Sequence, residues 1–269
     1  MKCSICGSTK IVREDKLLGI FNCEECSHTF TMIPKSEQED YNPEYFMEQH
    51  KNWFNNPNLE LFNLLYKKIK RNEKIKLIDV GCGKGDFLEY VAKIDTNIEL
   101  FGIDLVDNMS SRIHYMKGDF MKKKFKQKFD VVVSLAVIEH VENPNAFVKR
   151  IKEILKPNGR LYLMTINNDS LMYVIARFLK KIGARTAYNR LYSHHHLQHY
   201  TNRSLKKLLT QNGFKMEFLK NHNYTIKAVD VPKSNKVVEK LYKLVVFLIF
   251  MVSGHMRRGM MQTLGVKRG

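Results

Sequence analysis

Four cysteines near the amino terminus have the spacing of a metal site. Cys3 and Cys6 form one C-x-x-C pair, Cys23 and Cys26 form a second, and sixteen residues separate the two pairs. Two such pairs can bring four thiolates around one tetrahedral ion, and zinc is the ion that this ligand set favours. The pattern therefore predicts a structural zinc site with a closed ligand shell.

Residues 1–33 are predicted to form a small zinc ribbon that depends on this metal. A segment of this length buries too little apolar surface to fold unaided, so metal binding would supply its folding free energy. Two disulfides are the alternative, but no secretory signal precedes Cys3. His28 is expected to be a bystander, because the cysteines already complete the shell. Loss of the metal should unfold the ribbon and leave cofactor binding by the rest of the chain intact.

A glycine-rich turn is the second chemical signal. Gly81, Gly83 and Gly85 follow an apolar strand and precede residues 87–92, whose apolar spacing is that of a buried helix face. A dinucleotide site would carry G-x-G-x-x-G and hold a pyrophosphate at the helix N-terminus. This turn instead reads G-x-G-x-G, and Asp79 stands just before it. The acid favours a cationic ligand over a phosphate.

Two further acids stand where a nucleoside would need them. Asp104 ends an apolar strand about 20 residues past the turn, the position from which doubly wound folds bind ribose hydroxyls. Asp119 follows the next short strand and could accept a hydrogen bond from an adenine amino group. An acid at a strand end is also a common helix cap, and that alternative stays open for Asp119.

Candidate catalytic residues follow the fourth strand of this pattern. The crevice of a doubly wound fold opens beyond the carboxyl ends of its strands, so Glu139 and His140 are expected at its mouth. His140 could take the proton of an acceptor hydroxyl, because histidine titrates near neutral pH. Its alternative role is to cap the turn. A later loop with His194–His196 and His199 should also face the crevice. Adjacent imidazoles cannot all reach one ion, so His194 or His199 is expected to contact substrate.

From Asp79 onward the chain resembles class I S-adenosylmethionine-dependent methyltransferases. The nearest branch is the quinone O-methyltransferase-like group, with methyltransferase domains of type 23. The resemblance covers residues 57–231 and rests on several motifs that recur in order. These motifs are residues 79–87, Asp104, Gly118–Asp119, 129–134, 138–141 and 155–161.

The resemblance implies roles for particular residues. The implied cofactor set is Asp79, Gly81, Gly83 and Gly85 for the methionine part, Asp104 for the ribose, Asp119 for the adenine, and Leu135. The quinone enzymes also use a Glu three residues before the Glu–His pair to help hold a divalent metal. This chain has Ala136 there, so the resemblance does not carry a catalytic metal over to it.

The expected architecture is a doubly wound, Rossmann-like seven-stranded α/β sheet with a small N-terminal zinc ribbon and a C-terminal amphipathic helix. The 269 residues are 44% hydrophobic and can hold one full α/β domain besides the ribbon. An antiparallel hairpin is expected near Phe214–Val231. The predicted order is a ribbon (1–33), a connector that could act as a lid (34–56), the methyltransferase domain (57–231, with an amphipathic insertion at 168–193), and a hydrophobic, basic helix and tail (232–269). Tyr41, Tyr45 and Phe46 are candidate lid residues, with packing between domains as their alternative.

The formal net charge of +18 predicts an anionic partner, although an excess of Lys can also follow genomic base composition. Residues 171–182 form an apolar helical stripe, with basic residues from Arg177 to Arg185 away from it, which suits an anionic bilayer surface. The apolar run 244–252 is too short to span a membrane, which takes about 20 residues. Packing against the domain or a dimer partner is the alternative for both segments.

The predicted function is O-methylation of a small-molecule, glycan or lipid-linked acceptor. The enzyme is expected in the cytoplasm, peripheral on the inner face of the membrane. Methylation of a pyrimidine carbon usually proceeds through a cysteine nucleophile, but the one thiol besides the four metal ligands is Cys82, inside the cofactor loop, so transfer to oxygen or nitrogen is expected instead. An RNA methyltransferase whose zinc ribbon binds RNA is the first alternative, favoured by the positive charge. A non-catalytic S-adenosylmethionine-binding protein is the second.

Overall fold

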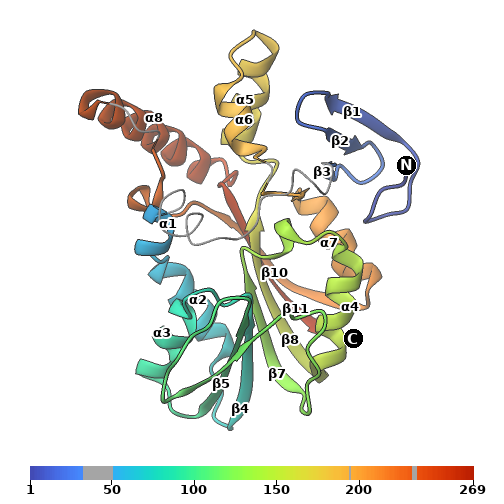
Figure 1. Cartoon of the computed structure of the whole chain (residues 1–269), viewed down its shortest axis with the longest axis vertical. Coiled ribbons are helices and arrows are strands. Elements are labelled where there is room, and N and C mark those ends of the chain that lie inside the picture. Colours follow the sequence, from blue (N-terminus) through green and yellow to red (C-terminus); the bar gives the residue numbers. More distant parts are fainter. Residues whose placement is uncertain (33–50, 194, 232–234) are drawn as a thin grey trace.

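The computed structural model describes residues 1–32, 51–193, 195–231 and 235–269, and a seven-stranded sheet forms its centre (Figure 1). The order of the strands is β10-β11-β8-β7-β4-β5-β6, and the five from β4 to β8 run parallel. This is the predicted doubly wound, Rossmann-like sheet. The parallel strands are β4 (Ile75–Val80), β5 (Ile98–Asp104), β6 (Ile113–Lys117), β7 (Phe129–Leu135) and β8 (Leu155–Ile166).

Helices cover both faces of the sheet. The first face carries α2 (Leu59–Ile69) and α3 (Asp86–Ile94), and the second carries α4 (Pro144–Ile154) and α7 (Asn202–Gln211) (Figure 1). Strand side chains alternate between the two cores, as the pleat requires, so each face of the sheet buries its own apolar layer.

The last residues of the chain complete the sheet. β10 (Phe214–His222) pairs antiparallel with β11 (Met261–Arg268), and β11 pairs antiparallel with β8. The partner of β10 therefore does not come from the predicted hairpin within 214–231, and the core domain continues past the predicted boundary at 231. Leu264 and Val266 are fully buried, and their burial holds β11 in the sheet.

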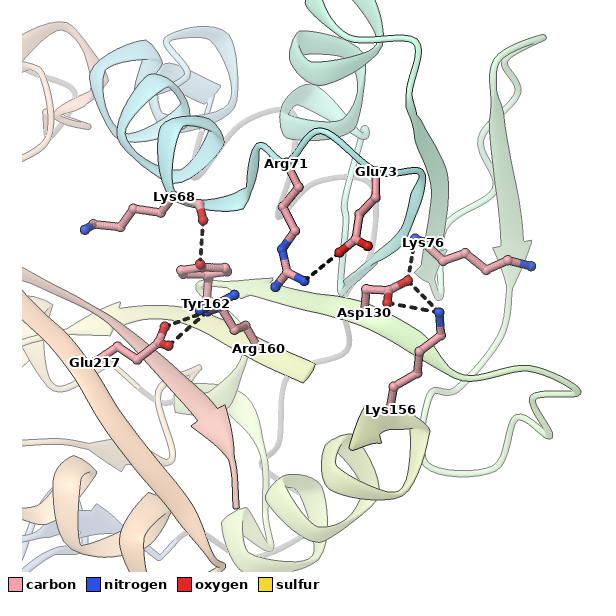
Figure 2. A network of polar contacts seen from close by, with 9 residues as sticks. All are labelled: Lys68, Arg71, Glu73, Lys76, Asp130, Lys156, Arg160, Tyr162 and Glu217. Atoms are coloured by element: carbon pink, nitrogen blue, oxygen red, sulfur yellow. Dashed lines mark hydrogen bonds and ion pairs between the residues drawn. The ribbon is translucent and has the colours of Figure 1, made fainter. Parts of the chain in front are cut away.

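Polar contacts tie together the amino-terminal ends of the central strands (Figure 2). Asp130 of β7 accepts a hydrogen bond from the N–H of Lys76 in β4 at 2.8 Å and pairs with Lys156 of β8 at 2.8 Å. On the next strands, Arg160 pairs with Glu217 at 2.9 Å. These contacts hold the register of the strands at one end of the sheet, while the loops at the opposite end remain available to build a site.

The amino-terminal segment is a three-stranded antiparallel ribbon that docks on the main domain. Its third strand pairs with a short strand from the main domain, so the two parts share one four-stranded sheet. The strands of this sheet are β1 (Ile11–Asp15), β2 (Ile20–Cys23), β3 (Thr29–Thr31) and β9 (Gln198–His199).

An insertion between β8 and β9 stands beyond the carboxyl ends of the parallel strands (Figure 1). It contains α5 (Leu171–Lys181) and α6 (Thr186–Leu191). Its basic residues were expected to face an anionic bilayer, but Lys180 and Arg185 pair with buried Asp15 of the ribbon at 2.8 Å and 2.6 Å. Burial alone would raise the pKa of Asp15, but the hydrogen bonds from these side chains and the Leu18 N–H outweigh it and lower the pKa to about 2.

Other side chains at α5 show the same pattern, in which basic groups contact the protein and large apolar groups face solvent. Arg177 donates to the carbonyl of Asn168 at 3.0 Å, while Phe178 and Ile182 stay 62% and 65% exposed. Phe178 of α5 and the C-cap residue Ile182 are therefore turned toward solvent, whereas Arg177 and Lys180 contact the protein. The ion pairs with buried Asp15 hold Lys180 and Arg185 on the ribbon side of the insertion, through charge-assisted hydrogen bonds that are stronger than neutral ones.

α8 (Lys236–His255) projects from the same end of the molecule as the insertion (Figure 1). It buries Val246, Phe250 and Ser253 and exposes most of its other apolar side chains. The exposed ones are Val237, Val238, Leu241, Leu244, Val245, Phe247, Leu248, Met251 and Val252. No helix in the described ranges has the length and apolar character needed to cross a bilayer.

Two predictions concern residues outside the described ranges. The candidate lid residues Tyr41, Tyr45 and Phe46 lie there, and so does His194. The described end of the connector is α1 (Lys51–Asn55), which packs near the 3-10 turn η4 (Ile226–Ala228).

Candidate cofactor and acceptor site

The glycine turn connects β4 to α3 in the predicted strand–turn–helix context. Gly81, Gly83 and Gly85 have φ values of 74°, 53° and 81°, which favour glycine. A Cβ on Gly81 would lie 2.3 Å from a methyl of Val137, so the turn packs closely against the segment after β7. A Cβ on Gly83 would meet nothing within 4 Å. Gly83 therefore leaves open space at the backbone, into which a ligand can approach.

Asp79 is the buried acid of this turn. Its side chain is 3% exposed, and Oδ1 has no hydrogen-bond partner among the described residues. Burial first, and the charge of Asp104 second, raise the pKa of Asp79 to about 8. A buried carboxyl oxygen without a partner fits a ligand that carries an ammonium or sulfonium group, and S-adenosylmethionine carries both.

The other predicted cofactor residues line a neighbouring cavity, which shares Gly81 and Gly83 with the small pocket that Asp79 lines. Asp104 accepts hydrogen bonds from the N–H groups of Gly83 at 2.8 Å and Val106 at 3.0 Å. Asp119 accepts one from the N–H of Met121 at 2.8 Å, as a capping acid does, and also lines the cavity. Leu135 lies at the end of β7 and lines the cavity from the opposite side. Tyr115 of β6 was not predicted as part of this site. Its hydroxyl lies where a Cβ on Gly85 would be, so its ring packs directly against the glycine turn.

A cavity of about 1290 Å³ begins at these residues and continues beyond them. Ligand sites commonly measure about 300–1,000 Å³, so this cavity has room for a nucleoside cofactor and an acceptor together. Its far wall is mostly apolar and comes from the insertion, α8 and the segment before α8. The residues of this wall include Met172, Leu179, Ala187, Leu191, Tyr224, Val229, Tyr242 and Val246.

Glu139 and His140 lie in the 3-10 turn η3 (Ile138–His140) and line the middle of the cavity. Glu139 is 1% exposed and accepts a hydrogen bond from the Thr165 hydroxyl at 2.8 Å, and burial raises its pKa to about 7. His140 Nδ1 donates to the carbonyl of His195 at 2.7 Å. In the neutral ring, Nε2 is then the nitrogen that can accept a proton.

The structure brings His196 to the cavity, and not His199. His199 is fully buried against Tyr173 and Tyr192, does not line the cavity, and has its pKa lowered to about 3 by burial. His196 lines the cavity, with its ring 5.0 Å from that of His140. Glu139, His140 and His196 offer ligand atoms within 4.8 Å of one another, a cluster that could hold a cation.

The four cysteines also come together as predicted. Cys3 and Cys26 have their sulfurs 3.7 Å apart, those of Cys6 and Cys23 are 3.5 Å apart, and all four lie within 4.8 Å of one another. Tetrahedral zinc–sulfur bonds of about 2.3 Å separate two sulfurs by about 3.8 Å. The cluster thus fits one tetrahedral ion.

Comparisons with known sequences agree with this geometry. A methyltransferase-domain family model matches residues 51–218. The mitochondrial ubiquinone biosynthesis O-methyltransferase of Dictyostelium discoideum is 29% identical over 146 residues, which cover 44% of this chain and 44% of that protein. Its counterpart in Arabidopsis thaliana is 36% identical over 115 residues, which cover 38% of this chain and 35% of that protein. The match therefore spans less than half the length of these two relatives.

Solved structures share the fold. Phosphoethanolamine N-methyltransferase 2 of Haemonchus contortus, in complex with S-adenosyl-L-methionine, has a TM-score of 0.57 at 14% identity, covering 84% of this chain and 58% of that one. The cyclopropane synthase MmaA2 of Mycobacterium tuberculosis has a TM-score of 0.51 at 18% identity, covering 78% of this chain and 84% of that one. At such identities the similarity establishes the architecture and leaves the acceptor open.

Proposed function

Since the chain belongs to the methyltransferase-domain family and has the class I S-adenosylmethionine-dependent fold, we propose that it methylates a hydroxyl oxygen on an apolar, quinone-type or lipid-linked acceptor. One observation carries this proposal: a single cavity joins Asp104, His140 and the apolar wall of the insertion and α8. The relatives named as ubiquinone biosynthesis O-methyltransferases support oxygen as the acceptor atom and a quinone precursor as its class.

The cofactor half of the cavity would hold S-adenosylmethionine through the predicted set. Asp79 would pair with the ammonium group, Asp104 would accept from the ribose hydroxyls, and Asp119 would accept from the adenine amino group. Gly83 would let the methionine part approach the backbone, since it leaves open space there. The bound cofactor supplies an electrophilic methyl group on a sulfonium.

His140 would act as the general base. Its Nδ1 donates to the carbonyl of His195, so Nε2 can receive the proton of the acceptor hydroxyl as that oxygen becomes a nucleophile. Glu139 precedes His140 in the chain, is buried, and accepts a hydrogen bond from the Thr165 hydroxyl. It would provide a polar group that contacts the acceptor rather than act as the base. Burial raises the pKa of Glu139 to about 7, so this carboxyl holds a proton for much of the time near neutral pH.

The apolar wall favours an acceptor with a hydrophobic part. Met172, Leu179, Leu191 and Val246 line the side of the cavity away from the glycine turn. Beside them, α8 exposes a broad apolar surface flanked by Lys236, Lys240 and Lys243. An apolar surface with basic flanks suits the headgroup region of an anionic bilayer. We therefore include peripheral membrane binding through α8 in the proposed function, as the route to a lipid-linked acceptor.

The ribbon would hold one structural zinc ion. The donor set of four sulfurs and their separations support this assignment. Metal analysis of protein prepared without chelator should find about one zinc per chain, and Cys23→Ser should lower that content. Protein that is folded and free of zinc would contradict the assignment.

A panel of acceptors tests the proposed function. Labelled S-adenosylmethionine would be offered with a catechol, the same catechol carrying an apolar chain, a lipid-linked sugar, and RNA. We expect transfer to the chain-bearing catechol or the lipid-linked sugar, with a KM that falls as the apolar chain lengthens, because the chain would occupy the apolar wall. Transfer to RNA alone would contradict the proposal.

A further inference from the structure

The ribbon reaches the acceptor site through one pair of strands. Thr29 and Phe30 of β3 lie opposite His199 and Gln198 of β9. β9 ends the loop that carries His196 into the cavity, and the ribbon and this loop are separated by more than 160 residues of chain. The position of a cavity residue therefore depends on a segment that the sequence predicts to be a separate module.

Thr31 holds the loop directly. Its hydroxyl donates to the carbonyl of His196 at 3.0 Å, and its backbone N–H donates to the carbonyl of Leu197 at 2.9 Å. The same oxygen lies 3.3 Å from His199 Nε2, which can donate to it. Thr31 is 6% exposed, so these hydrogen bonds are shielded from water and hold the loop more firmly than exposed ones would.

A second chain of hydrogen bonds leads from the ribbon to the turn with the proposed base. His28 Nε2 donates to the side-chain oxygen of Gln198 at 2.8 Å, and the amide nitrogen of Gln198 donates to the carbonyl of Val141 at 3.1 Å. Val141 follows His140 in the chain. Both sides of the His140–His196 pair are thus connected to the ribbon, one through Thr31 of β3 and the other through His28 just before it.

The loop in turn sets the chemistry of His140. The carbonyl of His195 accepts the hydrogen bond from His140 Nδ1 at 2.7 Å, and this bond selects the tautomer in which Nε2 is the acceptor. If the loop moved away, this selection would be lost, and with it the orientation of Nε2. The segment 195–199 is therefore a positioning segment for the proposed base.

The cysteine cluster holds β3 in place. Cys23 ends β2, Cys26 ends the turn that follows it, and the Cys23 N–H donates to the carbonyl of His28 at 2.8 Å. Cys3, Cys23 and Cys26 are buried in the same apolar cluster as Tyr200 at the start of α7. A metal bound by these cysteines would fix the turn that leads into His28 and β3, and so would hold the residues that contact the loop and β9.

We propose that the metal-bound ribbon is a positioning element of the acceptor site, which sets His196 and the orientation of His140 through Thr31 and Gln198. The proposal rests on the proposed role of His140 as general base. It identifies Thr31 and Gln198 as positioning residues for methyl transfer. Loss of the metal then impairs the acceptor half of the cavity and leaves the cofactor half, on β4 and β5, intact.

The first test is Thr31→Val, which removes the hydroxyl and keeps the shape of the side chain. We expect amide exchange in residues 195–199 to accelerate at least tenfold, the fraction of His140 protonated on Nδ1 to fall in nitrogen NMR spectra, and kcat to fall about tenfold. Affinity for S-adenosylmethionine should stay within twofold. Thr31→Ser restores a hydroxyl and should restore all three quantities.

Thr9→Val is the matched control, since it makes the same change at an exposed position of the ribbon. If exchange in 195–199 and the His140 tautomer are the same in Thr31→Val as in Thr9→Val, the proposal is wrong.

Removal of the metal from the full chain, followed by addition of Zn²⁺, gives an independent test. Amide exchange in 195–199 should rise and then recover, while exchange in residues 81–85 stays unchanged. Exchange and NMR need no acceptor. A normal rate of methyl transfer in His140→Ala would therefore refute the role of His140 as the base. The exchange and NMR measurements would still decide whether Thr31 positions the loop.

Discussion

The carboxylate of Asp104 repels negative charge on the buried carboxyl of Asp79, in the strand next to it. Together with burial, which is the larger effect, this repulsion raises the pKa of Asp79 to about 8. At neutral pH the ligand-free protein therefore keeps a proton on Asp79, and a cationic ligand would favour its release. A single carboxyl thus links cofactor binding to pH.

Affinity for S-adenosylmethionine should rise as the pH increases toward about 8. Asp79 must lose its proton to pair with a cation, and below its pKa each unit of pH weakens binding by up to about tenfold. Calorimetry in buffers of different ionisation enthalpy measures both the dissociation constant and the protons released. Asp79→Asn does not titrate and should bind weakly, with a flatter pH profile. If affinity changes with pH equally in the parent and in Asp79→Asn, Asp79 does not pair with the ligand.

Asp79→Asn should also stabilise the ligand-free protein. Between the unfolded pKa of 3.8 and the folded value of about 8, the folded state keeps a proton that the unfolded chain has released. Stability therefore falls as the pH rises through this range, and Asn removes the loss. We expect a higher Tm for the variant at pH 7 and a smaller difference near pH 4. Asp107→Asn, at an exposed carboxyl, is the control and should leave Tm nearly unchanged. An Asp79→Asn variant no more stable than its parent at pH 7 would refute the burial argument.

The strand–turn–helix of the candidate cofactor site could be predicted from sequence because its geometry is local. A strand, three glycines and a helix follow one another within residues 75–94 and leave the backbone little choice, and Asp79 and Asp104 are carried by adjacent parallel strands. The seven-stranded sheet follows from the same repeating pattern of strands and helices.

The acceptor half depends on segments that are distant in sequence. His196 lies on the loop before β9 and His199 lies in β9 itself, and the pairing of β9 with β3 decides which of them faces the cavity. Spacing within the loop cannot reveal that choice. The strand Met261–Arg268 was missed for a similar reason, since its partner Phe214–His222 is separated from it by the whole of α8. Its basic end also resembles a tail.

His140→Ala should lower the rate of methyl transfer by roughly a hundredfold to ten-thousandfold, the usual contribution of a general base. Cofactor affinity should stay nearly unchanged, because the imidazole would act on the acceptor. His199→Ala provides the contrast: it removes a fully buried ring packed on Tyr173 and Tyr192 and should lower Tm. Thermal unfolding and single-turnover rates measured on both variants separate the two effects. Normal turnover in folded His140→Ala protein would exclude His140 as the base.

The apolar surface of α8 should bind vesicles that contain anionic lipids. Leu244 and Leu248 are each 52% exposed and lie one helical turn apart, so replacing both with Glu puts two charges into the surface that would enter the headgroup region. We expect the parent to float with anionic vesicles, more strongly at low salt because its lysines contribute, and the double variant to remain in the soluble fraction. Leu17→Glu, at a 79% exposed position of the ribbon, is the control and should float like the parent. Equal flotation of the parent and the α8 variant would show that α8 is not the membrane-binding surface, and chromatography would then test whether it packs against a second copy of the chain.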